Sequence, residues 1–220
     1  MNALAMDAVL IDGLSPLYRL ALAYAPGPAK PAWLSFLSLD TRLAGLLRQA
    51  RDPVLAQIRL AWWRERLEQA PCDRPRGEPL LARFADWPDG GSALSPLVDG
   101  WEALLGDPPL PLAALESFAQ GRAAGISALA ACMGLADPAP DLARSWAMAD
   151  LACHLGDPRE QALALKGLAD CPAPAGLPRA LRPLLVLQRV STRAARKGGA
   201  AHLTTPAALF TAMRAGLLGC

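Results

Sequence analysis

Two side chains spaced one helical turn apart are the first candidates for chemistry in this sequence. Asp150 and His154 occupy positions i and i+4 of an expected helix, so they share one face and together could ligate a metal. Two ligands do not complete a metal site, and no further ligand is evident nearby, so we predict no metal centre there. The chain has only two histidines and shows no Ser/His/Asp or Cys/His arrangement, which gives no support for nucleophilic catalysis.

Basic side chains on an apolar helix are the second candidates. The stretch 53–67 is apolar over most of its helical circumference, and such a helix is expected to be surrounded by other helices. Arg59 and Arg66 fall within the same arc as Trp62 and Trp63. An arginine there extends to solvent, pairs with an acid of a neighbouring helix, or binds an anion inside the protein. Core packing is the simplest interpretation of the two tryptophans, and the lining of a lipid cavity is the alternative.

Other charged residues have simpler explanations. Asp99 and Glu102 are expected to lie on a solvated face. Four cations form the basic end of an expected helix: Arg189, Arg193, Arg196 and Lys197. They complement the dipole at a helix C-terminus, and the alternative is contact with an anionic membrane surface or an acidic partner.

The overall composition is typical of one globular domain. The 220 residues are 53% hydrophobic, and the net charge of +2 argues against a nucleic-acid binder that works by neutralising phosphates. Five cysteines without CxxC spacing suit a reducing cytosol, so we expect a cytoplasmic protein. The N-terminal stretch is a poor signal peptide, and no uncharged run is long enough to span a membrane. Positive mean hydropathy without such a run leaves peripheral membrane contact open.

Proline and glycine divide the chain into helical segments, and no stretch shows convincing strand alternation, so we predict an all-α fold. Ser15, Asp52 and Asp141 are the expected N-caps of three helices. Small residues in the helix over 112–134 predict close packing at the centre of a bundle. The expected helices cover about 2–11, 16–24, 31–50, 53–67, 78–86, 92–105 (with Ser95 as the alternative start), 112–134, 142–155, 158–169, 178–197 and 205–218.

Several segments, in their order along the chain, resemble those of the squalene/phytoene synthase family. They cover 18–26, 33–47, 51–64, 79–82, 97–101, 115–125 and 177–183. The third contains a fairly specific pattern, Arg-Leu-x-Trp-Trp-Arg at 59–64. The resemblance implies an isoprenoid-synthase fold over residues 1–220, with helices around a central apolar cavity. It makes Trp62, Trp63 and Phe118 candidates for lining that cavity.

Enzymes of this family condense two prenyl diphosphates head to head, and two aspartate-rich helical motifs hold the Mg²⁺ ions that neutralise the leaving group. The positions that correspond to the first motif's acids are Ala44, Gly45 and Arg48, none of which can ligate a metal. Asp40 remains one turn earlier, and Asp150 is the only acid within 142–156, where the second motif should fall. These metal sites do not carry over, so we expect no cofactor and keep Asp40 and Asp150 as the candidate catalytic acids.

Of the family's basic residues that bind diphosphate, only those around Arg59 and Arg64 can be matched. We take Arg59, Arg64 and Arg66 as the candidate anion-binding residues. The string at 137–141 has DxxxD spacing, but its two internal prolines prevent the carboxylates from sharing a helical face. We interpret it as a linker that ends in the N-cap Asp141.

The missing acids lead us to expect a non-catalytic member of the family that binds a protein partner or an isoprenoid-like lipid. Without bound cations, a diphosphate of about three negative charges cannot be ionised off a substrate. One branch of the family, which acts in respiratory complex I assembly, also lacks the paired acids and resembles this chain around the Trp-Trp segment. The resemblance therefore implies an assembly-factor-like role.

Two alternatives stay open. The first is a divergent Mg²⁺-dependent prenyltransferase of isoprenoid biosynthesis that uses Asp40, Asp150, Arg59 and Arg64. The second is a helical protein whose likeness to the family is partly compositional. An open cavity between Asp40 and Asp150 would favour the enzyme, and a filled interior would disfavour both catalysis and lipid binding.

Overall fold

The computed structural model describes residues 3–50, 52–75, 77–136, 138–168 and 176–219. Within these residues the fold is all-α, with short 3₁₀ turns and loops between the helices and no strand, as the sequence predicts. The helices are α1 (Ala3–Gly13), α2 (Pro16–Ala23), α3 (Lys30–Gln49), α4 (Pro53–Glu68), α5 (Pro79–Ala82), α6 (Ser95–Glu102), α7 (Leu112–Cys132), α8 (Pro140–His154), α9 (Pro158–Leu168), α10 (Arg182–Arg196) and α11 (Pro206–Met213). A π-helical turn, Arg214–Leu218, continues α11.

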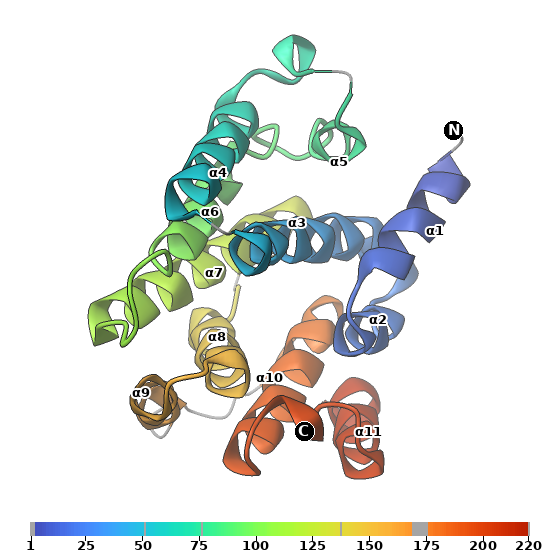
Figure 1. Ribbon diagram of the computed structural model, residues 1–220. Coiled ribbons are helices and arrows are strands. Elements are labelled where there is room, and N and C mark those ends of the chain that lie inside the picture. The colour runs from blue at the N-terminus through green and yellow to red at the C-terminus, as the bar shows by residue number, and fades with distance from the viewer. Residues whose placement is uncertain (1–2, 51, 76, 137, 169–175, 220) are drawn as a thin grey trace.

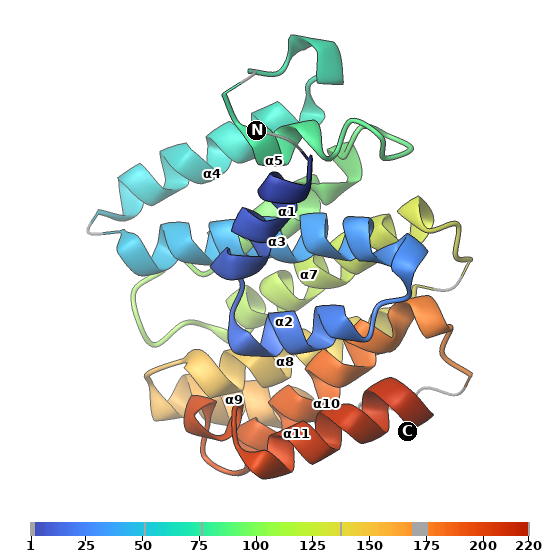
Figure 2. The same cartoon turned by 90° about the vertical axis from the view of Figure 1, so that its right-hand side faces the viewer.

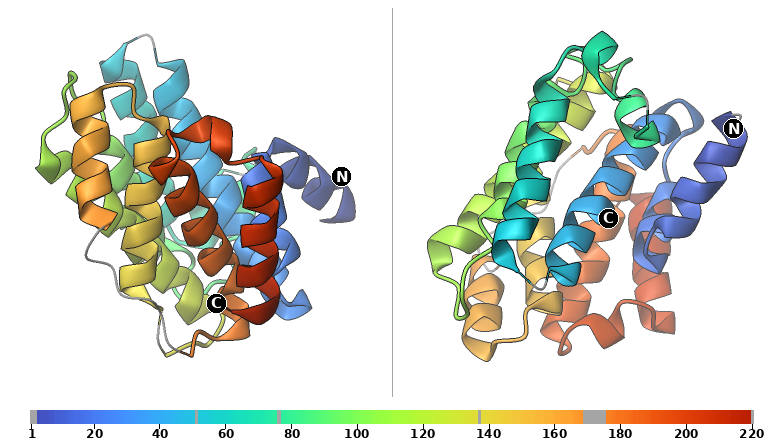
Figure 3. Two further views of the ribbon diagram at one scale, coloured as in Figure 1. Left: turned by 90° about the horizontal axis from the view of Figure 1, so that it is seen from below. Right: turned by 45° about the horizontal axis from the view of Figure 1, so that its top comes forward.

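Helix α3 crosses the middle of the molecule and contacts α2, α4, α6 and α7 (Figure 1). Helices α8 and α10 pack closely below it, while α9 and α11 lie on the outer flanks (Figure 1). Figure 2 shows α3, α2 and α11 running across the molecule one below the other. In the right-hand view of Figure 3, α4, α6 and α7 lie together along one side of the bundle.

Local signals set most helix starts. The Ser15 hydroxyl accepts a hydrogen bond from the Tyr18 amide at 3.2 Å, and the Asp52 carboxylate accepts one from the Val54 amide at 2.9 Å. Both expected N-caps are therefore confirmed. The expected N-cap Asp141 is wrong, because α8 already begins at Pro140, whose fixed φ suits the first helical position. Four expected helices are several residues shorter than predicted: α5, α6, α10 and α11.

Helices α6 and α7 approach each other closely through glycine. A Cβ atom on Gly121 would lie 2.3 Å from the Pro96 carbonyl oxygen and 2.9 Å from the Gly100 Cα. Eleven residues of α7 are buried, from Leu115 to Ala130. The expected central position of this small-residue helix is confirmed, and it places the α7 side chains described below at the core.

Helix α4 is not surrounded, contrary to the sequence-based expectation. Its buried residues are Ala56, Leu60, Trp63 and Leu67, which form one stripe. Four further apolar side chains of α4 are exposed: Val54 by 59%, Leu55 by 54%, Ile58 by 60% and Trp62 by 36%. Apolar character on all sides predicted full burial, but only one side of α4 packs on α3 and α6. The helix therefore leaves an apolar face of about 100° open.

None of the helices among the described residues combines the length and the apolar character needed to cross a bilayer.

The contact between α6 and α7 can be tested with one methyl group. We expect Gly121→Ala to lower the free energy of unfolding by about 2 kcal/mol, because the new Cβ meets backbone atoms that cannot move aside. Urea unfolding followed by circular dichroism measures this. The control is Gly45→Ala on α3, whose Cβ meets nothing within 4 Å and which should gain up to about 1 kcal/mol. Equal stability of the two variants would contradict the close approach.

Candidate functional site

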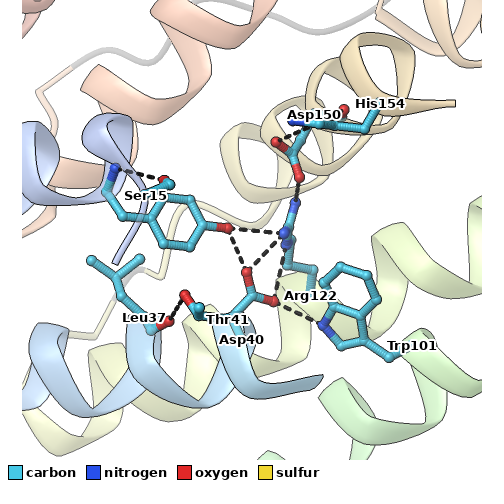
Figure 4. Close-up of polar contacts among 9 residues, drawn as sticks. Ser15, Leu37, Asp40, Thr41, Trp101, Arg122, Asp150 and His154 are labelled. Atoms are coloured by element: carbon cyan, nitrogen blue, oxygen red, sulfur yellow. Dashed lines mark hydrogen bonds and ion pairs between the residues drawn. The ribbon is translucent and has the colours of Figure 1, made fainter. Parts of the chain in front are cut away.

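A guanidinium lies at the centre of the bundle, between the two acids that the sequence singles out (Figure 4). The side chain of Arg122, on α7, is 1% exposed. Its Nη2 is 2.7 Å from Asp40 Oδ2, and its Nη1 is 2.8 Å from Asp150 Oδ2. The fold thus brings Asp40 of α3 and Asp150 of α8 to one place, but an arginine side chain fills the space between them.

The carboxylate of Asp40 is fully engaged by hydrogen bonds. The Tyr18 hydroxyl donates to Oδ2 at 2.5 Å, and the Trp101 indole Nε1 donates to Oδ1 at 2.9 Å. Arg122 adds bonds from Nη2 and Nε, at 2.7 and 3.4 Å. Two donors therefore reach each oxygen, which leaves no free lone-pair direction for a metal ion.

Aromatic rings enclose the same guanidinium. Its central carbon lies 4.1 Å from the Trp146 ring centroid, 4.8 Å from Phe118 and 5.6 Å from Trp101. Attraction between the ring faces and the cation adds to the ion pairs. Phe118, expected to line an open cavity, instead packs on Arg122 and Trp101 and is 1% exposed.

The electrostatics of the cluster keep its ion pairs charged. Burial tends to lower the pKa of Arg122, but the charges of Asp40 and Asp150 outweigh burial and raise it. Burial likewise tends to raise the pKa of Asp150, yet the nearby Arg122 cation and His154 lower it well below the usual value. The pKa of Tyr18 is raised chiefly by burial, so its hydroxyl stays protonated and donates to Asp40.

The predicted pair Asp150 and His154 also exists, as part of this cluster. His154 Nδ1 lies 2.8 Å from the Asp150 carbonyl oxygen and 3.4 Å from its Oδ1. The hydrogen bond with Asp150 raises the pKa of His154 above its usual value. The other Asp150 oxygen faces Arg122, so this pair connects the interior to the surface (Figure 4). Among the described residues, no group of three or more His, Cys, Asp or Glu side chains is placed to hold a metal ion.

The three predicted anion-binding arginines do not converge on this cluster. Arg59 is exposed on α4. Arg64 pairs with Asp99 at 2.6 Å and with Glu102, which joins α4 to α6. Asp99 and Glu102 are thus not simply a solvated face, because both contact this half-buried arginine.

Arg66 and the tryptophans of α4 are separate from the cluster as well. Arg66 donates to Gln69 Oε1 at 2.7 Å and lies 6.0 Å from the Trp62 ring centroid. Trp63 is buried, whereas Trp62 is 36% exposed. The two rings meet edge to face, with centroids 5.3 Å apart. They therefore do not line one common cavity, because one packs in the core and the other faces solvent.

The sequence-based reasoning missed Arg122. The available signal was a lone cation among small residues in the middle of the helix expected at the centre of the bundle. A buried arginine there needs an acid from another helix. Asp40 was a candidate for that acid, because no second acid stands near it on its own helix to bind a metal.

Comparisons with known proteins give no further identification: no protein-family model, no curated protein and no solved structure matches this chain.

Removal of the guanidinium should strongly destabilise the protein. We expect Arg122→Gln to lower the free energy of unfolding by about 3–5 kcal/mol, because Asp40 is then left buried without a cation and Asp150 keeps only His154. Urea unfolding at neutral pH provides the measurement. Arg48→Gln, at an exposed site on α3, is the control and should change stability by less than about 0.5 kcal/mol. A loss below about 1 kcal/mol for Arg122→Gln would show that the cluster does not stabilise the fold.

Proposed function

We propose that this chain is a non-catalytic protein of the squalene/phytoene synthase type that acts by binding a protein partner. The observation that carries the proposal is the position of Arg122 between Asp40 and Asp150. In a prenyltransferase of this type, metal ions would occupy the space between facing acids and neutralise the diphosphate leaving group. Here the guanidinium of Arg122 occupies that space, and it forms ion pairs with both carboxylates.

The same guanidinium is poorly placed to bind a diphosphate itself. Arg122 is 1% exposed and enclosed by Trp101, Phe118 and Trp146. A diphosphate of about three negative charges would have to displace both carboxylates and enter an aromatic enclosure. The arrangement therefore supports a structural role for Asp40 and Asp150.

The open face of α4 supports a protein partner. Val54, Leu55, Ile58 and Trp62 form a contiguous exposed apolar face on one helix, and exposed patches of this kind mark interaction sites. Arg59, which has no ion pair among the described residues, lies beside it. This helix also carries the most specific segment of the family resemblance. An assembly-factor-like role follows from analogy with the family branch that acts on respiratory complex I.

An isoprenoid-like lipid is the second ligand class, and one feature favours it. A cavity of about 800 Å³ opens between α1, α5, the start of α3 and the end of α7. Its lining is mostly apolar and includes Met6, Ala32, Trp87 and Met133. Ligand pockets have volumes of about 300–1,000 Å³ and mostly apolar walls. A lipid chain would enter this outer cavity instead of the filled interior.

We also propose a cytoplasmic location, because five cysteines without CxxC spacing suit a reducing compartment.

The absence of catalysis can be tested directly. We expect no pyrophosphate release when the purified protein is incubated with Mg²⁺ and farnesyl or geranylgeranyl diphosphate, because no lone pairs of Asp40 are free for metal. An enzyme-coupled pyrophosphate assay provides the measurement. Release that disappears in Asp40→Asn or Asp150→Asn variants, both checked for folding by circular dichroism, would establish the prenyltransferase alternative.

The partner-binding face can be tested with charge substitutions. We expect Leu55→Glu and Ile58→Glu to abolish capture of a specific protein from native cells while leaving the melting temperature unchanged, since both side chains are more than half exposed. Val9→Glu on α1 is the matched control, because Val9 is exposed to the same 60% as Ile58. Identical capture by all three variants would rule out α4 as the partner-binding face.

A further inference from the structure

The C-terminal part of the sequence has a one-sided charge. After Asp170 the chain contains no Asp or Glu and seven basic residues: Arg179, Arg182, Arg189, Arg193, Arg196, Lys197 and Arg214. Because the whole chain has a net charge of +2, the part up to Asp170 carries −5. Such an asymmetry between segments is typical of proteins that bind nucleic acid or membranes.

Helix α10 arranges part of this charge into a stripe. Arg189, Arg193 and Arg196 fall within an arc of about 60° on the helix, and Lys197 follows at its C-cap. The rest of α10 is largely buried against α2, α8 and α11. Figure 3 (left) shows α10 and α11 side by side across the face seen from below. We call Arg189, Arg193, Arg196 and Lys197 the basic surface.

The cations of the basic surface have no acid to pair with among the described residues. Arg189 and Arg193 are half-buried residues, and two of their buried nitrogens, Arg189 Nε and Arg193 Nη1, have no hydrogen-bond partner. Arg182 Nε also lacks a partner, but Arg182 Nη1 donates to the carbonyl oxygens of Gly216 and Leu217 at 2.9 and 2.6 Å, so this side chain is held against the turn after α11. The dipole at the end of α10 accounts for cations in its last turn, but Arg189 lies about two turns before that end.

The neighbouring helix supplies exposed apolar side chains. Helix α11 and the turn after it touch the core mainly through Ala208, Ala212 and Ala215. Five larger side chains remain 42–70% exposed: Leu209, Phe210, Met213, Leu217 and Leu218. A soluble polyanion does not require such residues, whereas a lipid surface buries them at the boundary between headgroups and acyl chains.

We propose that α10 and α11 bind a membrane surface rich in anionic lipid. The basic surface contacts lipid phosphates, and the apolar side chains of α11 enter the headgroup region. The basic surface of α10 lies beside the exposed apolar side chains of α11, and this combination favours a membrane. A nucleic acid is bound mainly through cations and does not require an apolar face. The proposal is independent of whether the chain is catalytic and of the partner at α4, because it uses neither Arg122 nor the α4 face.

Co-sedimentation of the full-length protein with vesicles tests the proposal. The vesicles contain phosphatidylcholine alone, or phosphatidylcholine with about a third phosphatidylglycerol, at low and high salt. We expect binding to the anionic vesicles only, and weaker binding at high salt. Arg189→Gln with Arg193→Gln should reduce partitioning about 30-fold, since each cation near an anionic surface contributes a factor of about five.

Matched variants separate this surface from general charge and hydrophobicity. Lys30→Gln with Arg48→Gln removes two exposed cations of α3 and should leave partitioning nearly unchanged. Phe210→Ser or Leu217→Ser should reduce partitioning about tenfold, whereas Leu112→Ser, an exposed leucine of α7, should not. Circular dichroism checks that each variant is folded.

Three outcomes would overturn the proposal. One is equal binding to neutral and anionic vesicles, or none to either. Another is an equal loss of binding in the α3 control. The third is unchanged vesicle binding in Phe210→Ser and Leu217→Ser together with equally tight binding to soluble polyglutamate, which would assign the basic surface to an acidic macromolecule.

Discussion

The ion pairs of Arg122 with Asp40 and Asp150 constrain the interior of this protein more than any other contact described. A buried charge is tolerated only where its partners are held in good geometry, and here the members come from α2, α3, α6, α7 and α8. One planar guanidinium therefore fixes five helices relative to one another. A lysine could not replace it, because a single ammonium cannot reach both carboxylates with a rigid fork of donors.

Most of the fold could be predicted because its signals are local. Helix starts depend on an N-cap or a proline within a few residues, as at Ser15 and Asp52. The Arg122 cluster instead pairs Arg122 with Asp150 and Asp40, which are 28 and 82 positions away in the sequence. The periodicity of apolar residues along a helix does not indicate contacts between such distant positions. The prediction that α4 is surrounded by other helices was wrong for a related reason. Its apolar circumference was evident, but the number of helices packed against it is decided elsewhere in the chain.

Net charge was an incomplete guide to the surface. A total of +2 suggests a nearly neutral protein, yet it is the sum of an acidic part up to Asp170 and a strongly basic remainder. Fields near a protein follow the local arrangement of charges. The two exposed apolar faces differ accordingly. The face of α4 adjoins an ion-paired contact with α6, while α11 lies beside unpaired cations on α10.

The sequence separations within the Arg122 cluster have a consequence for how the chain acquires its structure. Tyr18 and Arg122 are 104 residues apart, and Asp150 lies 28 residues beyond Arg122. During synthesis, α2 and α3 leave the ribosome well before their charged partner exists. Asp40 must then remain hydrated, so the early helices stay loosely packed until α7 and α8 emerge. Assembly of this core is therefore a long-range step, and contacts of such high sequence separation form more slowly than the local contacts within a helix.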